Sequence, residues 1–559
     1  MKLFASATIV KYFSWRKSMH LAHLSRPSRA RGQAHFSFFL HHLSASAAGS
    51  ARTVFALLGG RPTLGHPSLS MMAASRSMSW TTVRYIVKFE FGRAPVLDLH
   101  PVWRRGSVDV SRGLQFGRRA MSRRDPAGQT AKGKRSMLTA EQNDMLTRVG
   151  PGTPAGNLLR RYWQPIAAAV EMTDKWTKRV RLLGEDLVLF KDRQGRLGLI
   201  AEFCPHRRAS LAYGIPTKDG IRCPYHGWEF GRNGQCLNQP NESDKTAFRD
   251  KVGTEGYPVE ELGGLLFAYL GPEPRSLLPH YDGFVAEGTI KMLGRTVVPV
   301  NWLQIMENSL DPIHTEWLHG HHYEFIKENE GVKVAISAKH EKIAFREFEY
   351  GITKHRLLAG HSEDSDDWRI GHPVVFPNML SVGNGDENSR YYAFQIRVPI
   401  DDTNTMHFWY SAYVPPKDAA VDLKLAEKVH LYEVPFKNKD GEFILDNVES
   451  QDIMAWVTQG PIADRTRENL GASDQGIAMY RRVLRREIKK VEEGLDPMAT
   501  IREETKNQWI DLPNERKKHH NSEGLRSWMM RTHAAYSPIL DDLVALFEPK
   551  KPGPIRLAG

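Results

Sequence analysis

The sequence predicts an α+β protein, in which a small all-β domain precedes a larger domain with an antiparallel sheet. Residues 180–203 alternate apolar and polar side chains between turn-forming glycines, as half-buried strands do. Residues 333–415 repeat this alternation over a longer stretch and predict a second, larger sheet. Residues 474–496 instead carry apolar side chains at helical spacing and predict an amphipathic helix that ends at Gly494.

Residues 1–136 differ in composition from the rest of the chain. They hold 23 of the 77 Lys and Arg but only 4 of the 64 Asp and Glu, and they lack sustained periodicity. This composition is typical of a transit peptide, and equally of translation upstream of the true start. We expect the protein to begin at Met137 and treat residues 1–136 as a basic extension outside the fold.

The formal charge of +13 therefore says little about the folded part. After residue 136 the chain holds 54 basic and 60 acidic residues, which gives no footprint for nucleic acid. No apolar run is long enough to cross a membrane. Three cysteines in 559 residues argue against a disulfide scaffold and suit a reducing compartment, so we expect a cytoplasmic protein.

A cluster of cysteine and histidine residues predicts an iron–sulfur site. Cys204 and His206 are two positions apart, and Cys223 and His226 are three apart. Two such loops can hold a 2Fe–2S cluster, with thiolates on one iron and imidazoles on the other. A zinc site accepts the same residue types, but zinc fingers usually place two cysteines in one arm and two histidines in the other.

A second cluster lies about ninety residues later and predicts a mononuclear iron site. His314 and His319 are five positions apart around an interrupted helical stretch, and Asp311 precedes them. Two histidines and one carboxylate with open positions suit ferrous iron that must bind O₂. Partly buried, satisfied histidines are the plainer interpretation, and His321 and His322 crowd the same segment.

The carboxylate ligand must come from elsewhere in the chain, and Asp474 is our candidate. It stands at the start of the predicted amphipathic helix. A carboxylate is also favoured at that position as a helix N-cap without any metal. Asp464 and Glu468 are weaker candidates, because nothing in their surroundings points them inward.

With these two motifs, the chain after Met137 resembles the α subunits of Rieske non-haem iron aromatic-ring oxygenases. It looks most like the group of phthalate dioxygenase and 5,5′-dehydrodivanillate O-demethylase. The resemblance implies an all-β Rieske domain and a catalytic domain whose antiparallel sheet is flanked by helices. We place an N-terminal helical segment of the catalytic part at 137–160, the Rieske 2Fe–2S domain at 161–275 and the mononuclear iron domain at 276–559.

The same resemblance implies a reaction and partners. A ferredoxin or flavin reductase would pass electrons from NAD(P)H to the cluster, and O₂ and an aromatic substrate would meet at the Fe(II) of His314, His319 and Asp474. The family implies a homotrimer or hexamer. In it Asp311 would act in catalysis by bridging His226 of one subunit to His314 of its neighbour, whereas an ordinary turn before Pro312 is the alternative role for this residue.

Three functions remain open at this stage. The substrate is expected to be a carboxylated and possibly methoxylated aromatic compound, oxidised by O-demethylation or monooxygenation. Cis-dihydroxylation of the ring is the alternative, and a non-catalytic Rieske electron carrier is a remote third. Arg390, Arg397 and Lys354 could anchor an aromatic acid, but a solvated strand face explains them more simply, so the sequence assigns no substrate residue.

Overall fold

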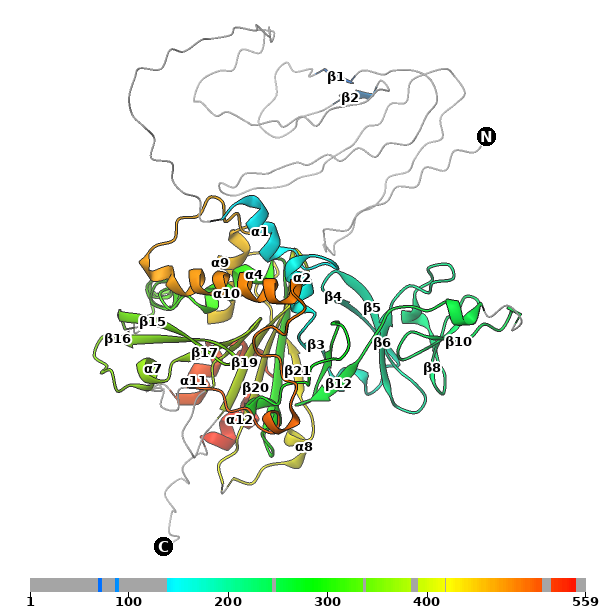
Figure 1. The fold of residues 1–559 in the computed structure, drawn as a ribbon. Helices are drawn as coiled ribbons and strands as arrows, with labels where there is room; N and C mark the ends of the chain where they lie inside the picture. The colour runs from blue at the N-terminus through cyan, green and yellow to red at the C-terminus, as the bar shows by residue number, and fades with distance from the viewer. Residues whose placement is uncertain are drawn as a thin grey trace. The chain divides into compact units, whose positions relative to one another are not determined.

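The computed structural model describes residues 69–72, 86–89, 138–243, 248–334, 338–383, 391–417, 419–514 and 524–548 (Figure 1). The chain divides into two compact units, residues 1–128 and 129–559. In the first unit, β1 (Leu69–Met72) pairs antiparallel with β2 (Ile86–Phe89). The remainder of the predicted extension, and Met137 itself, lies outside the described residues.

The small domain is built from short antiparallel strands in three sheets, as the alternating sequence predicts. Buried Val188, Phe190 and Ile200 pack around the two buried cysteines Cys204 and Cys223. The sheets have the orders β11-β6-β5-β4, β10-β9-β8-β7 and β12-β13-β3. Their strands are β3 (Gln164–Ala168), β4 (Thr177–Leu182), β5 (Glu185–Lys191), β6 (Leu197–Ala201), β7 (Ile215–Pro216), β8 (Gly220–Arg222), β9 (Glu229–Gly231), β10 (Cys236–Asn238), β11 (Gly256–Tyr257), β12 (Val259–Leu262) and β13 (Leu265–Ala268).

The larger domain contains an eight-stranded sheet of order β15-β16-β17-β18-β19-β20-β14-β21. All neighbours pair antiparallel except β14 and β21, so one edge differs from the fully antiparallel sheet that the sequence predicts. After β20 the chain crosses β14 and returns in the direction opposite to β20. Because β14 also runs opposite to β20, the returning strand β21 lies parallel to β14. The strands are β14 (Ile290–Val298), β15 (His340–Phe348), β16 (Gly351–Leu358), β17 (His372–Val375), β18 (Met379–Ser381), β19 (Tyr391–Asp401), β20 (Asn404–Tyr413) and β21 (His430–Glu433).

Helices flank this sheet, which confirms the expected α+β class (Figure 1). The predicted amphipathic helix is α10 (Gln475–Glu492), which buries Val483, Leu484 and Ile488 in the main core. No helix in the described part of the chain is long and apolar enough to span a membrane. The other α-helices are α1 (Ala140–Thr147), α2 (Pro154–Leu159), α3 (Asp282–Val285), α4 (Trp302–Ser309), α5 (His314–Glu316), α6 (His322–Asn329), α7 (Asp366–Arg369), α8 (Leu423–Ala426), α9 (Val448–Thr458), α11 (Gly524–Met530) and α12 (Leu540–Phe547).

Candidate metal centres

The two Cys/His loops of the small domain share one backbone geometry. The amide of Cys204 donates to the carbonyl of Ala209, and the amide of Cys223 donates to the carbonyl of Trp228, at 2.9 and 2.8 Å. In both loops the residue four positions after the cysteine has a positive φ, 62° at Arg208 and 78° at Gly227. The two loops therefore form equivalent turns, as expected if both bind the same metal cluster.

The two cysteines lie together in the interior of this domain. Burial, aided by the neighbouring Cys223, raises the pKa of the Cys204 thiol to about 11. Two thiolates at this place would need strong compensation by positive charge, which iron ions provide. The donor set and its burial thus fit a cluster held by two thiolates.

The two histidines form the other half of the site. The rings of His206 and His226 lie 4.6 Å apart, and the His206 ring stacks on Trp228 at 4.4 Å. Nδ1 of His226 is buried and has no hydrogen-bond partner among the described residues. A buried ring nitrogen without a protein partner, beside a second imidazole, is suited to bind a metal.

His314 and His319 are brought together by a change of helix type. His314 belongs to α5, and His319 lies in η5 (Trp317–His321), which is a π-helix. In an α-helix, residues five apart point about 140° away from each other, whereas a π-helix repeats after roughly that interval. The two rings consequently lie 5.2 Å apart on one face. The interrupted helical stretch expected from the sequence takes this form.

The third member of this cluster is Asp452, on α9. Its Oδ1 atom lies 3.3 Å from Nε2 of His319 and 3.7 Å from Nε2 of His314. Within the described residues, these three form a group whose ligand atoms all lie within 4.8 Å of one another. Helix α9 packs directly on the π-helix, which places the carboxylate opposite both rings.

The assignment of Asp474 as the carboxylate ligand is corrected by this geometry, since Asp474 is not part of the group. Its Oδ2 atom accepts a hydrogen bond from the amide of Gly471 at 2.6 Å, just before α10. Asp474 thus stands at the N-cap position of α10, as the alternative interpretation expected, but its side chain binds the preceding turn and caps no amide of α10. Asp464 is bound to Thr466 and Glu468 to Arg481, so neither reaches the histidines.

Asp452 was missed because nothing near it in the sequence marks a metal site. It sits inside an ordinary helix beside Gln451, far along the chain from both histidines. A carboxylate on a buried helix face could have been suspected, yet the sequence offers several such positions. Only the packing of α9 against η5 selects this one.

The charges of the three side chains suit a divalent cation. Burial lowers the pKa of His314 to about 4 and keeps its imidazole neutral, the form that binds metal. Burial also acts to lower the pKa of His319, but the carboxylate of Asp452 outweighs it and raises that pKa. In turn His319 overcomes the effect of burial and holds the pKa of Asp452 below its usual range. A cation would take over the place of the His319 proton.

Two neighbours orient these ligands. Oε1 of Gln451 lies 2.7 Å from Nδ1 of His319, which leaves Nε2 of that ring directed at Asp452. The side-chain amide of Asn308 donates to Oδ1 of Asp452 at 3.3 Å. Such partners fix ring and carboxylate orientation around a metal.

Asp311 lies beside the cluster, at the turn between α4 and α5. Its Oδ1 accepts from the amide of Ile313 at 2.8 Å, so it does serve the turn that was its alternative role. Its other oxygen, Oδ2, lies 3.7 Å from Nδ1 of His314, too far for a hydrogen bond. That His314 nitrogen is buried and unpartnered within the described chain. The carboxylate can therefore serve the turn and face the histidine at once.

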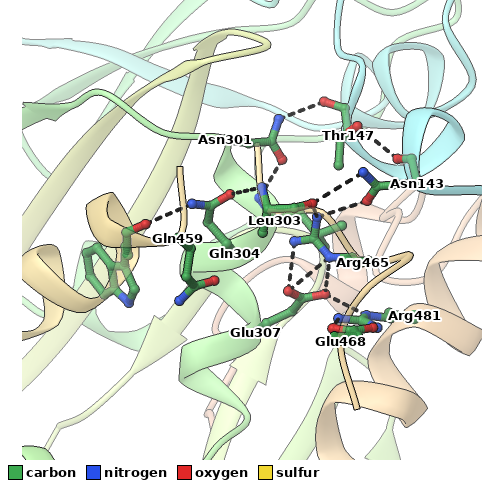
Figure 2. Close-up of polar contacts among 12 residues, drawn as sticks. Asn143, Thr147, Asn301, Leu303, Gln304, Glu307, Gln459, Arg465, Glu468 and Arg481 are labelled. Carbon is green, nitrogen blue, oxygen red and sulfur yellow. Dashed lines mark hydrogen bonds and ion pairs between the residues drawn. The ribbon is translucent and has the colours of Figure 1, made fainter. Parts of the chain in front are cut away.

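A buried polar network holds α4, the helix that leads into this turn (Figure 2). Glu307 accepts from Arg465 at 2.7 Å and from Arg481 at 2.6 Å, and Gln304 donates to the carbonyl of Trp456 at the end of α9 at 2.9 Å. One helix is thereby tied to α9, to α10 and to the segment between them. The network fixes the base from which Asn308, Asp311 and His314 project.

Comparison with known proteins shows the family of this chain. The model of the Rieske [2Fe-2S] domain matches residues 162–257, and a model described as LigXa C-terminal domain like matches residues 436–511, which include Asp452. The 5,5′-dehydrodivanillate O-demethylase oxygenase subunit of Sphingobium sp. (strain NBRC 103272 / SYK-6) is 45% identical over 67% of this chain and 87% of that protein. The chain belongs to the Rieske non-haem iron oxygenases.

Other relatives of this Rieske oxygenase are more distant. The phthalate 4,5-dioxygenase oxygenase subunit of Pseudomonas putida is 32% identical over 62% of this chain and 85% of its own length. The phenoxybenzoate dioxygenase subunit alpha of Ectopseudomonas oleovorans is 34% identical over 63% of this chain and 86% of its own length. The protein is thus an oxidoreductase that acts with O₂, as the resemblance implied.

The residues of this Rieske oxygenase fit the cofactors of its family. A 2Fe–2S cluster would be held by Cys204, Cys223, His206 and His226. A mononuclear iron would be held by His314, His319 and Asp452, which leave coordination positions open for O₂.

Proposed function

We propose that this chain is the oxygenase component of an enzyme that O-demethylates methoxylated aromatic acids. The observation that carries the proposal is the group of His314, His319 and Asp452, in the same chain as the Cys/His loops. The 45% identity to an O-demethylase oxygenase subunit supports the reaction type. A single-domain electron carrier has no use for the second group, which argues against that role.

The reaction consumes electrons that must come from outside the chain. We expect NAD(P)H to supply them through a flavin reductase, with or without a ferredoxin. The bound iron would supply O₂ activation, and the protein would supply position and electrostatics. One oxygen atom of O₂ is inserted into a methyl C–H bond. Two electrons and two protons reduce the other oxygen atom to water. The resulting hemiacetal breaks into a phenol and formaldehyde.

The chain's own residues have distinct parts in this scheme. Gln451 and Asn308 orient His319 and Asp452, so that the ligands are in place before substrate enters. Asp311 faces His314, and we assign it to the path of electrons from the cluster, in a trimer from the cluster of a neighbouring subunit. Asp311 keeps 27% of its side chain exposed, which leaves it accessible to such a contact.

The test is product analysis with the purified protein, a reductase, NADH and O₂. A panel of methoxylated and plain aromatic acids is supplied, and formaldehyde is trapped and quantified. One formaldehyde per phenol formed is the expected result. A cis-diol from a plain ring without formaldehyde would overturn O-demethylation in favour of dihydroxylation. His314→Ala is the matched inactive control, since it should lose mononuclear iron but keep the 2Fe–2S absorption.

A further inference from the structure

Several buried polar atoms without partners lie on two neighbouring strands of the large sheet and on helix α9. In the described part of the chain they include Nε of Arg397, both ring nitrogens of His407, Nε1 of Trp456 and Oε2 of Glu449. Nearly all buried polar groups in folded proteins are hydrogen-bonded, so such a concentration needs a reason. Its position, beside the helix that carries Asp452, suggests that these atoms serve a bound molecule.

Arg397 and His407 lie directly opposite each other on neighbouring strands. They are register partners in the antiparallel pair β19 and β20, so their side chains project from the same face of the sheet. Arg397 is 1% exposed and His407 is 0% exposed. The sequence analysis put Arg397 on a solvated strand face, and the structure corrects this. Lys354 is also buried, and Arg390 lies outside the described residues.

The face with these two residues is turned toward the iron site. The ring of His407 stacks parallel to Trp456 of α9, with centroids 5.7 Å apart. Trp456 follows Asp452 by four positions, one helical turn, and so lies on the same side of α9. Arg397 is close enough to Asp452 for that carboxylate to act on its pKa. The pair therefore lies on the side of the sheet that faces α9, near the candidate iron ligand Asp452.

Arg397 is a cation without a counter-ion in the described structure. Among the described residues its guanidinium donates to Gln395 alone, to the carbonyl at 3.0 Å and to the side-chain oxygen at 2.7 Å. Burial lowers its pKa to about 9, so it remains charged at neutral pH. Burial of an unpaired charge is costly, and a carboxylate is the group that a guanidinium pairs with best.

His407 complements this charge as a neutral hydrogen-bond donor. Burial lowers its pKa far below the usual value, and the Arg397 charge acts in the same direction. A neutral imidazole donates from one nitrogen, beside a cation that donates from several. Two donors side by side match the two oxygens of one carboxylate.

We propose that Arg397 and His407 bind the carboxylate of the aromatic substrate and thereby direct its ring toward the iron site. This inference rests on the proposed function for the site and names the substrate group that the chain recognises. It requires that an acid bind better than its uncharged amide. It also requires that the preference disappear when the guanidinium is removed.

The experiment measures binding to the metal-loaded, reduced protein under anaerobic conditions by calorimetry. The probes are 3-methoxybenzoate and its uncharged analogue 3-methoxybenzamide. Wild type should bind the acid at least tenfold more tightly. Arg397→Gln should lose about 10- to 100-fold in affinity for the acid, because a charged hydrogen-bonded pair is lost. Its affinity for the amide should change little, because the amide carries no charge. His407→Gln should lose about tenfold for the acid.

A matched control comes from the other face of the same sheet. Arg295 lies on β14, one position from the register partner of His407, and is paired with Glu171 and Glu433. Arg295→Gln should leave both affinities as in wild type. Iron content and the 2Fe–2S absorption show that each variant is folded, and if Arg397→Gln fails to fold, His407→Gln decides the question.

The outcomes separate this inference from the proposed function. Equal binding of acid and amide by wild type, or unchanged acid binding in a folded Arg397→Gln or His407→Gln, overturns the carboxylate site. If formaldehyde is still released in that case, O-demethylation stands without it. If the acid binds through Arg397 but no formaldehyde forms in the presence of reductase, the recognition site stands and O-demethylation fails.

Discussion

Oε1 of Gln451 lies 2.7 Å from Nδ1 of His319, and the next residue of the same helix, Asp452, faces the other nitrogen of that ring. Two consecutive positions of α9 thus hold both sides of one imidazole. Gln451 is itself fixed, because its amide donates to the carbonyl of Leu445 at 2.8 Å. The amide oxygen must accept, so Nδ1 carries the proton and Nε2 is the nitrogen left for metal.

Gln451→Leu should therefore weaken iron binding without touching the 2Fe–2S cluster. Loss of a partner of this kind typically costs 10- to 100-fold in metal affinity. Iron per chain after dialysis against a graded chelator, with the cluster absorption as internal reference, measures the effect. Gln459→Leu, at the exposed end of the same helix, is the control. Unchanged iron retention in Gln451→Leu would refute the orienting role.

Asp452→Ala and Asp474→Ala distinguish the two candidate carboxylates. The first should lose most of the mononuclear iron and all oxygenation, because one of three protein ligands is gone. The second should keep both, since Asp474 accepts only from the amide of Gly471. Metal analysis together with the electron paramagnetic resonance signal of the reduced cluster reads out each site separately. Loss of iron from the Asp474 variant alone would reverse our assignment.

Asp311→Asn should slow electron transfer while leaving both metals bound. The amide can still accept from the backbone at Ile313, so the turn before α5 is preserved, but the negative charge facing His314 is lost. We expect single-turnover reoxidation of the reduced cluster to slow by at least tenfold with substrate and O₂ present. Glu324→Gln, whose carboxylate lies 3.8 Å from Nδ1 of His321, is the control. Reoxidation at the wild-type rate would remove Asp311 from the path.

Glu307→Gln should destabilise the catalytic domain. Arg465, 1% exposed at its side chain, would lose the carboxylate that it contacts at 2.7 Å and remain buried and charged. Breaking a buried pair in this way costs about 3–5 kcal/mol, which lowers the melting temperature by several degrees. Thermal unfolding followed by tryptophan fluorescence measures it. Glu503→Gln, which breaks an exposed pair with Lys506, should leave the melting temperature almost unchanged.

The difference in stability between wild type and Glu307→Gln should depend on pH with a defined sign. Burial acts to raise the pKa of Glu307, but the charges of Arg465 and Arg481 outweigh it and hold that pKa below its usual range. A carboxyl with a lowered folded pKa stabilises above its unfolded value near 4.3, and that stabilisation is lost as pH falls through the folded value. The gap between wild type and Glu307→Gln should be full at pH 7 and narrow below about pH 4. A gap that widens with acid would contradict the assigned charge state.

The fold class and the candidate iron–sulfur ligands could be predicted because the sequence patterns that indicate them are local. Cys204 and His206, like Cys223 and His226, are joined by short loops, so their spacing alone limits how they can bind metal. Strand alternation and the periodicity of α10 are likewise local, and the fold class follows from them. The helix type around His319 could not be foreseen, although the five-residue spacing required some departure from an α-helix.

The sequence by itself predicted the α+β class, which the structure confirms, and it proposed the iron–sulfur ligands and the two histidines of the second centre. Only the tertiary structure brought Asp452, and not Asp474, to the two histidines, and buried Arg397 opposite His407. Gln451 lies 132 residues after His319, and no spacing rule reaches across that distance. Such partners are chosen by the packing of α9 on the π-helix and by strand register, which depend on the whole buried core and not on any one segment.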